Sequence, residues 1–260
     1  MPDILIRRDG AVGRVVISNS DKLNAMTTQM WLTLPQRVAE LDADPEIHAI
    51  VLVGDGDKAF VSGGDISQFG SERADMASQQ VYGDAVEAAY MALVCASKPV
   101  VAQIRGICMG GGLGLAAACD IRICSDDARF RMPPGRLGLG YDPAGVSRFV
   151  SLIGVQNTFD IFLSARVFDA AEALRIGLIS RVTAPSQLDA EVQALAESIA
   201  DNAPLTARAV KLAIRAHVGD ISQGDAAAAE AAADACNASE DYREGVRAFG
   251  EKRRPVFKGS

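Results

Sequence analysis

The chain has 260 residues, of which 49% are hydrophobic and 23% are charged, and its formal net charge is −7. This composition excludes a disordered, collagen-like or coiled-coil protein, and the length suits one large domain, or a domain with a small appendage. The acidic balance argues against a nucleic-acid-binding protein, and the apolar runs are shorter than the roughly 20 residues that a membrane-spanning helix needs. No signal peptide is expected.

The first half of the sequence predicts strands that alternate with helices. Strands are expected at 1–8, 14–18, 49–53, 99–104 and 121–124, and helices at 27–41, 84–96 and 113–119. The continuous apolar run AIVLV at 49–53 is typical of a parallel strand that is covered on both faces. This alternation predicts an α/β core with parallel strands.

The second half is predicted to be mainly helical. A last strand is expected at 178–182, followed by helices at 188–201, 205–217, 225–236 and 242–253. We therefore divide the chain into an α/β core over 1–200 and a helical C-terminal region over 201–260. That region serves either for the assembly of subunits or as a lid over the core.

The chain has five cysteines: Cys95, Cys108, Cys119, Cys124 and Cys236. Their number is odd and no pair has CxxC spacing, so we predict reduced, buried thiols in the cytoplasm instead of disulfides. The two histidines, His48 and His217, are far apart in the sequence and have no ligand-like neighbours. Neither a metal site nor histidine-based acid–base chemistry is expected.

Two glycine-rich loops follow predicted strands, at 59–66 (AFVSGGDI) and 106–114 (GICMGGGLG). Glycine lets a ligand approach the main chain, and the second loop opens a helix whose first amides have no helical partner. If the two sets of amides converge, they form an oxyanion hole; otherwise the glycines serve only tight packing. The pattern GxGxxA at 112–117 also matches a dinucleotide-binding fingerprint, but the helix is too short and no acidic residue has the required spacing.

Several motifs follow one another along the chain. They are KLNA at 22–25, SGGDI at 62–66, KPV at 98–100, GGGLGLAxxCDIR at 110–122, ARF at 128–130, ALxxGL at 173–178 and EGxxAFxEKR at 244–253. In this order they resemble the crotonase family, also called the enoyl-CoA hydratase/isomerase superfamily, over almost the whole chain. The resemblance implies a spiral of ββα turns and a C-terminal helical region that forms trimers, commonly paired as hexamers.

The resemblance also implies an acyl-CoA thioester as the substrate, so that coenzyme A is part of the substrate and no separate cofactor is needed. Its thioester oxygen would be held by the backbone amides of Gly64 and Gly111. The substrate and its coenzyme A would be bound by Lys22, Leu23, Ala25, Gly64, Asp65, Ile66, Ser67 and Gly111, and across a subunit boundary by Lys258. Residues 69–80 and 84–96 would line or cover the acyl pocket.

Hydratases of this family resemble one another in having two glutamates that act on the water molecule, and this sequence has neither glutamate. The positions that match them are Gly114 and Pro134. General acid–base groups contribute about 10²–10⁴ each to a rate, and neither residue can transfer a proton. Hydration by the two-glutamate mechanism is therefore not expected.

Asp142 and Tyr141 are the candidates to replace these glutamates. Asp142, which precedes Pro143, is either a helix N-cap or an acid/base group. In position it is similar to the acidic residue of dienoyl-CoA isomerases and, more remotely, to the nucleophile of aromatic acyl-CoA dehalogenases. Tyr141 is either a packing residue or a residue near a departing carboxylate, because LGLGY at 137–141 resembles the corresponding run of methylmalonyl-CoA decarboxylase.

We therefore predict an enzyme that stabilises an acyl-CoA enolate through Gly64 and Gly111, with isomerisation or noncanonical hydration by Asp142 favoured. One alternative is decarboxylation of a malonyl-type CoA thioester with Tyr141. The other is a CoA-thioester binding protein without catalysis. We expect a cytoplasmic homotrimer or homohexamer, with no nucleic-acid or membrane partner.

Overall fold

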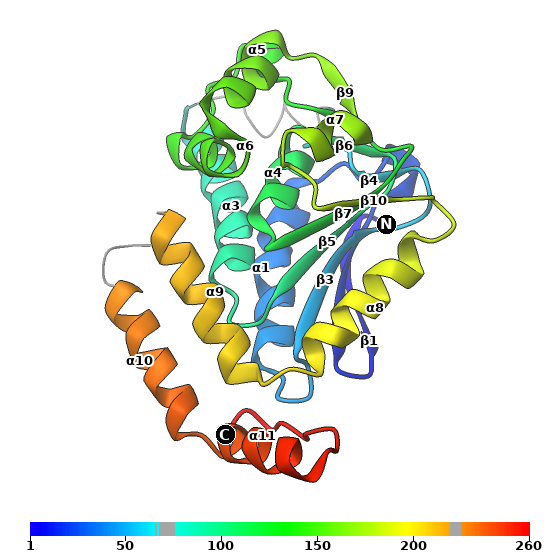
Figure 1. The fold of residues 1–260 in the computed structure, drawn as a ribbon. Coiled ribbons are helices and arrows are strands. Elements are labelled where there is room, and N and C mark those ends of the chain that lie inside the picture. Colours follow the sequence, from blue (N-terminus) through cyan, green and yellow to red (C-terminus); the bar gives the residue numbers. More distant parts are fainter. Residues whose placement is uncertain (66, 68–75, 219–224) are drawn as a thin grey trace.

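Two β-sheets form the centre of the computed structural model, which describes residues 1–65, 67, 76–218 and 225–260 (Figure 1). The larger sheet has the order β1 (Asp3–Asp9), β2 (Val12–Ser18), β3 (Ala49–Gly54), β5 (Val100–Ile104), β7 (Ile121–Ser125) and β10 (Arg181–Thr183). The smaller sheet has the order β4 (Ala59–Val61), β6 (Ile107–Met109), β8 (Arg129–Arg131) and β9 (Val167–Asp169). Neighbouring strands are parallel except that β1 and β9 are antiparallel to β2 and β8.

From β3 to β8, successive strands alternate between the two sheets, so that β3 and β4, β5 and β6, and β7 and β8 form pairs along the chain. These pairs are followed by α3 (Met76–Cys95), by α4 (Gly111–Ala118), and by α5 (Pro134–Leu137) with α6 (Pro143–Ser164). The chain thus winds as a spiral of ββα turns. The predicted α/β fold with parallel strands is confirmed.

Helices cover both faces of the larger sheet. Helix α1 (Thr28–Ala43) and α3 lie on one face (Figure 1), where Trp31 and Leu34 of α1 join the main apolar core. Helix α8 (Leu188–Ala200) covers the other face with Leu188, Val192 and Ala196. The Thr27 side chain caps α1 by accepting a hydrogen bond from the Met30 amide at 3.2 Å. Short helices η1 (Ser20–Lys22) and α7 (Ala170–Arg175) lie in connections.

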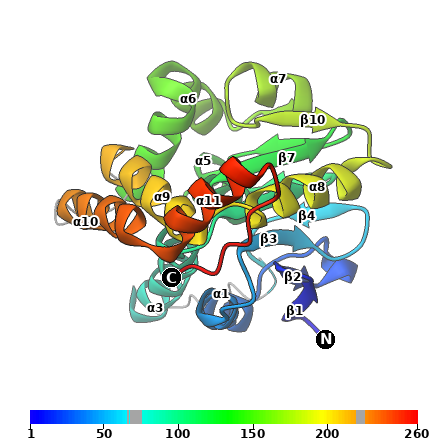
Figure 2. The ribbon, with the colours of Figure 1, turned by 60° about the horizontal axis from the view of Figure 1, so that its bottom comes forward.

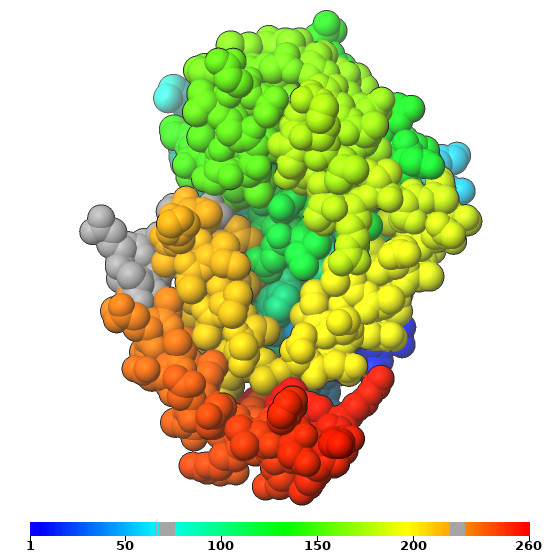
Figure 3. Space-filling view, viewed as in Figure 1, coloured from blue at the N-terminus to red at the C-terminus, as the bar shows by residue number. Residues whose placement is uncertain are grey.

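The C-terminal helices are α9 (Pro204–Val218), α10 (Asp225–Ala238) and α11 (Glu240–Glu251). Helix α10 packs on α9. Helix α11 and the C-terminus lie at the bottom end of the molecule in Figure 1, and Figure 2 shows them in front when that end is turned forward. In the space-filling view these helices form the lower part of one face and α6 with α7 the upper part, and the surface between them is recessed (Figure 3).

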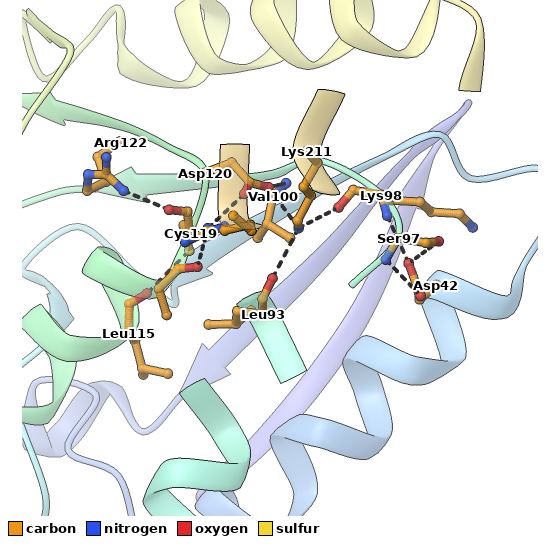
Figure 4. A network of polar contacts seen from close by, with 12 residues as sticks. Asp42, Leu93, Ser97, Lys98, Val100, Leu115, Cys119, Asp120, Arg122 and Lys211 are labelled. Atoms are coloured by element: carbon orange, nitrogen blue, oxygen red, sulfur yellow. Dashed lines mark hydrogen bonds and ion pairs between the residues drawn. The ribbon is translucent and has the colours of Figure 1, made fainter. Parts of the chain in front are cut away.

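Asp120, after α4, connects α9 to the core (Figure 4). Its carboxylate lies 2.9 Å from Lys211 Nζ and 2.8 Å from the Arg215 guanidinium, and it accepts a hydrogen bond from the Val100 amide at 2.7 Å. Lys211 Nζ also donates to the carbonyl oxygens of Leu93 and Lys98 at 3.2 and 3.0 Å. Polar bonds to three segments of the core therefore fix α9.

Two details of the sequence analysis were wrong. Helix α3 begins at Met76, before the expected start at residue 84. Cys108, Cys119 and Cys124 are buried as predicted, but Cys95, the last residue of α3, is exposed and Cys236 is half-buried. Burial raises the pKa of Cys119 to about 12. Among the described residues, the helices lack the length and apolarity that a membrane span requires.

Candidate active site

The two glycine loops meet beside the first residue of α4. Gly63 has φ +119° and Gly110 has φ +51°, values that other residues rarely adopt. A Cβ atom on Gly63 would lie 3.4 Å from the Met109 carbonyl oxygen and 3.9 Å from the Gly111 nitrogen. The loops that were separate candidates in the sequence are therefore in direct contact.

The amides of Gly64 and Gly111 make no hydrogen bond within the part of the chain that the structure describes. Gly111 is the first residue of α4, so its amide lies at the positive end of the helix dipole. The Met26 amide donates to the Gly63 carbonyl and the Asp65 amide donates to the Met26 carbonyl, each at 2.8 Å. These bonds fix the backbone on both sides of Gly64 and leave its own amide available to an oxyanion.

Lys22, Asp65 and Ser67 form a polar cluster beside the first glycine loop. Lys22 Nζ lies 2.7 Å from Asp65 Oδ2 and 2.9 Å from Ser67 Oγ, and Ser67 Oγ donates to Asp65 Oδ1 at 2.6 Å. The hydrogen bonds from Lys22 and Ser67 hold the pKa of Asp65 below its usual value. Lys22 and Ser67 are exposed whereas Asp65 is buried, so the cluster presents a cation and a hydroxyl to solvent.

The other predicted binding residues do not all lie in this region. Leu23 is exposed and Ala25 is buried in the same loop as Lys22. Ile66 lies outside the described residues, as do 69–75 of the predicted acyl-pocket loop. The Lys258 amide donates to Asp241 Oδ1 of α11 at 2.7 Å, and α11 lies at the opposite end of the molecule from β4 and β6 (Figure 1). A single chain does not bring Lys258 to the glycine loops.

We expect Lys22→Met to raise the pKa of Asp65 towards its ordinary value, because the hydrogen bond that lowers it most is lost. A carboxylate with a depressed pKa stabilises the fold above its unfolded pKa, and this contribution disappears as the pH falls through the folded value. The variant should therefore lose stability at neutral pH and match the wild type in acid. Carboxyl NMR titration and urea unfolding measure both effects. Arg37→Met, which removes an exposed ion pair, is the control. An unchanged Asp65 titration would contradict the assignment.

Two tyrosine hydroxyls fill the space beside Gly114, the position that matches the first hydratase glutamate. A Cβ atom on Gly114 would lie 2.4 Å from the Tyr90 hydroxyl and 3.1 Å from the Tyr141 hydroxyl. Tyr90 belongs to α3, and its hydroxyl donates to the Gly111 carbonyl at 3.2 Å. The sequence analysis missed Tyr90, because nothing in the sequence indicates that it approaches α4.

Asp142 is the N-cap of α6. Its Oδ2 accepts a hydrogen bond from the Gly145 amide at 3.0 Å, and Pro143 opens the helix. This cap confirms one of the two interpretations of Asp142. The carboxylate is also exposed, and its acid/base role stays a prediction. Pro134, the position that matches the second glutamate, opens α5.

Asn24 belongs to the KLNA motif, and the sequence alone indicated no role for it. It is 1% exposed, and its Nδ2 donates to the carbonyls of Asp55 and Ala59 at 2.9 and 2.8 Å. Its Oδ1 accepts from the Asn19 amide at 3.0 Å. Asn24 thus fixes the loop of Lys22 against β4.

A cavity of about 310 Å³ lies elsewhere, where β2, β3 and β5 meet the start of α8. It is lined by Arg7, Arg14, Val16, Val53, Gly54, Asp55, Gly56, Ala59, Phe60, Gln103, Arg105 and Asp189. None of the predicted site residues lines this cavity. The candidate site therefore depends on the contact between the glycine loops and not on this cavity.

Comparisons with known proteins show which sequences this chain is similar to. Residues 7–260 match the enoyl-CoA hydratase/isomerase family. The short-chain-enoyl-CoA hydratase of Clostridium acetobutylicum is 33% identical over 255 residues, covering 97% of this chain and 96% of the relative. The peroxisomal Delta(3,5)-Delta(2,4)-dienoyl-CoA isomerase of Arabidopsis thaliana is 33% identical over 262 residues, covering 96% and 93%.

A solved structure shows the same fold. The enoyl-CoA hydratase/carnithine racemase of Magnetospirillum magneticum is 34% identical and superposes with a TM-score of 0.91, covering 100% of this chain and 97% of that one. The family match, the whole-length relatives and the shared spiral all lead to the same assignment. The chain belongs to the enoyl-CoA hydratase/isomerase family.

Proposed function

We propose that the chain converts an acyl-CoA thioester through an enolate whose oxygen is held by the amides of Gly64 and Gly111. The observation that carries the proposal is the contact between the two glycine loops, in which both amides lack a hydrogen-bond partner among the described residues. Donors fixed in advance around developing charge are worth about 10²–10³ in rate each. Lys22, Leu23, Ala25, Asp65, Ile66 and Ser67 would bind coenzyme A, together with Lys258 from a neighbouring subunit.

Isomerisation or noncanonical hydration is the favoured reaction. The two positions that match the hydratase glutamates are Gly114 and Pro134, and the space beside Gly114 is filled by tyrosine hydroxyls. Asp142 would serve as the acid/base group that moves a proton next to the thioester carbonyl. The relatives include a dienoyl-CoA isomerase and enoyl-CoA hydratases at similar identity, so the choice against two-glutamate hydration depends on Gly114 and Pro134.

Decarboxylation of a malonyl-type CoA thioester is the second candidate. It is favoured by Tyr141, whose hydroxyl reaches the Gly114 position from the start of α6. Departure of CO₂ generates the enolate directly, so this reaction needs the two amides but no carboxylate base. Binding of thioesters without conversion is the remaining alternative.

Assembly into trimers or hexamers is part of the proposal. The C-terminal helices carry large apolar side chains that are exposed in the single chain: Val210, Ile214, Val246 and Phe249. Phe249 is 88% exposed, which a covering subunit would explain. Such a contact would also bring Lys258 of one subunit near another. We expect light scattering to give the mass of three or six chains, and a monomer would contradict this assignment.

The reaction is tested by incubating the protein in deuterated water with enoyl-, dienoyl- and malonyl-type CoA thioesters, followed by mass spectrometry. Deuterium uptake without gain of water is the expected result, since it indicates enolate formation or isomerisation. Gain of water would indicate hydration, and loss of CO₂ would place decarboxylation first. Binding of a thioester without any chemical change would indicate a CoA-thioester binding protein without catalysis.

Asp142→Asn tests the acid/base role with little effect on the fold, because asparagine is as good an N-cap as aspartate. We expect the rate of conversion to fall by about 10²–10⁴ while stability is maintained. Asp169→Asn is the matched control: Asp169 is an exposed N-cap of α7 that accepts from the Glu172 amide at 2.9 Å. Equal activity of the two variants would remove Asp142 from the mechanism.

A further inference from the structure

The cavity of about 310 Å³ occupies a part of the larger sheet that α8 leaves uncovered. Helix α8 forms one apolar cluster with three strand residues of this face: Val12, Val51 and Val101. The residues two places further along the same strands share this face, because side chains alternate between the two faces of a sheet. They are Arg14, Val53 and Gln103, and all three line the cavity. The cavity thus lies toward the carboxyl ends of β2, β3 and β5, the edge at which open α/β sheets bind their ligands.

The floor of the cavity is a row of side chains from three neighbouring strands. Val16 lies opposite Val53, and Val53 lies opposite Gln103. Gln103 is 4% exposed, and its Nε2 donates a hydrogen bond to Asp189 Oδ1 at 2.6 Å. The floor therefore offers the apolar surface of Val16 and Val53 to a ligand, and the amide at its end is held by α8.

Three arginines line the cavity beside this floor. Arg7 and Arg14 lie directly opposite each other on the antiparallel strands β1 and β2, and Arg105 follows the last residue of β5. Like charges that face each other across two strands destabilise the sheet. The carboxylates in the lining are those of Asp55 and Asp189, so cations outnumber anions there although the whole chain has a net charge of −7. The cavity is therefore a positively charged site on an acidic protein.

Arg14 is the arginine whose charge is left without a counter-ion. Arg105 lies 2.9 Å from Asp189, and Arg7 lies 3.7 Å from Asp55. The half-buried Arg14 guanidinium instead donates to two neutral amide oxygens, to Gln103 Oε1 at 3.1 Å and to Gln193 Oε1. Within the part of the chain that the structure describes, it makes no ion pair with a carboxylate. A cation that is withdrawn from water without a counter-ion costs free energy, and a bound anion would remove that cost.

We infer that this cavity binds a small organic anion, with its carboxylate or phosphate group at Arg14 and a short carbon chain over Val16 and Val53. A guanidinium group suits both oxyanions because its planar fork can donate two parallel hydrogen bonds. A volume of about 310 Å³ is at the lower end of the range for ligand pockets, which limits the ligand to a small molecule. The site is separate from the Gly64 and Gly111 amides and does not depend on the proposed function.

Calorimetric titration of the full chain at constant ionic strength tests the site with four probes: butyl phosphate, pentanoate, inorganic phosphate and butan-1-ol. We expect at least one of the two organic anions to bind about tenfold more tightly than inorganic phosphate, because its carbon chain covers the apolar floor. Butan-1-ol, which has the chain without the charge, should not bind. The tighter of the two organic anions identifies the preferred group as phosphate or carboxylate.

Arg14→Met should weaken binding of the preferred anion about 10–100-fold, because a charged hydrogen-bond donor is lost. Arg105→Met should also weaken it, and this variant decides the question if Arg14→Met does not fold, since the partner of Arg105 is a largely exposed aspartate. Arg37→Met and Lys22→Met are the controls. Each removes a cation that lies outside the cavity, and both should bind the anion like the wild type.

A wild type that binds neither organic anion overturns the inference, and so does unchanged binding in Arg14→Met or Arg105→Met. Loss of binding in Lys22→Met would place the anion at the polar cluster of the candidate active site and would overturn it too. Inorganic phosphate that binds as tightly as butyl phosphate would contradict an organic ligand. Because conversion of thioesters is not measured here, none of these results decides the proposed function.

Discussion

Asp120→Ala is expected to lower the free energy of unfolding by about 3–5 kcal/mol, the effect of removing one partner from a buried ion pair. Lys211 and Arg215 are each 8% exposed and both lie against this carboxylate. Without it, two buried cations repel each other and the Val100 amide loses its acceptor. Helix α9 should therefore loosen from the core.

Urea unfolding at one fixed protein concentration measures the loss. Glu40→Ala, which breaks an exposed pair with Arg37, is the control and should cost about 0–1 kcal/mol. In the double variant Asp120→Ala with Lys211→Met, the loss should be smaller than the sum of the single losses, because the unpaired cation is removed as well. Additive losses would show that Asp120 and Lys211 do not interact.

Gly112→Ala is expected to lower kcat/KM by about 10²–10³ for whichever thioester the wild type converts. A Cβ atom at this position would lie 2.2 Å from the Val61 carbonyl oxygen, so α4 and β4 must move apart. That movement separates the loop of Gly64 from the loop of Gly111, and two donors no longer face one oxyanion. The crowding should also cost about 1–3 kcal/mol of stability.

Gly250→Ala is the control, because a Cβ atom there would meet nothing within 4 Å. Gly250 lies inside α11, where alanine is favoured over glycine by about 1 kcal/mol, so this variant should be slightly stabilised and fully active. Steady-state kinetics and thermal unfolding of both variants measure the contrast. Wild-type activity in Gly112→Ala would show that the loops need not be held together.

Local signals in the sequence were enough to place most of the framework. The apolar run of β3 and the capped start of α1 each depend on neighbouring residues, and both were predicted close to their observed bounds. The motifs also identified the two glycine loops and the helical C-terminal region. Such features can be read because periodicity, capping and glycine conformation are properties of a short stretch of chain.

The tertiary structure alone decided the rest. Strands β4, β6, β8 and β9 have three residues each, too few for a pattern, and they exist because the spiral places them side by side. Tyr90 and Tyr141 are far apart in the sequence and meet only beside Gly114. Asp120 forms an ion pair with Lys211, which lies on a helix that is far from Asp120 in the sequence. These relations depend on packing between segments that no local preference encodes, and they determine which groups surround the candidate site.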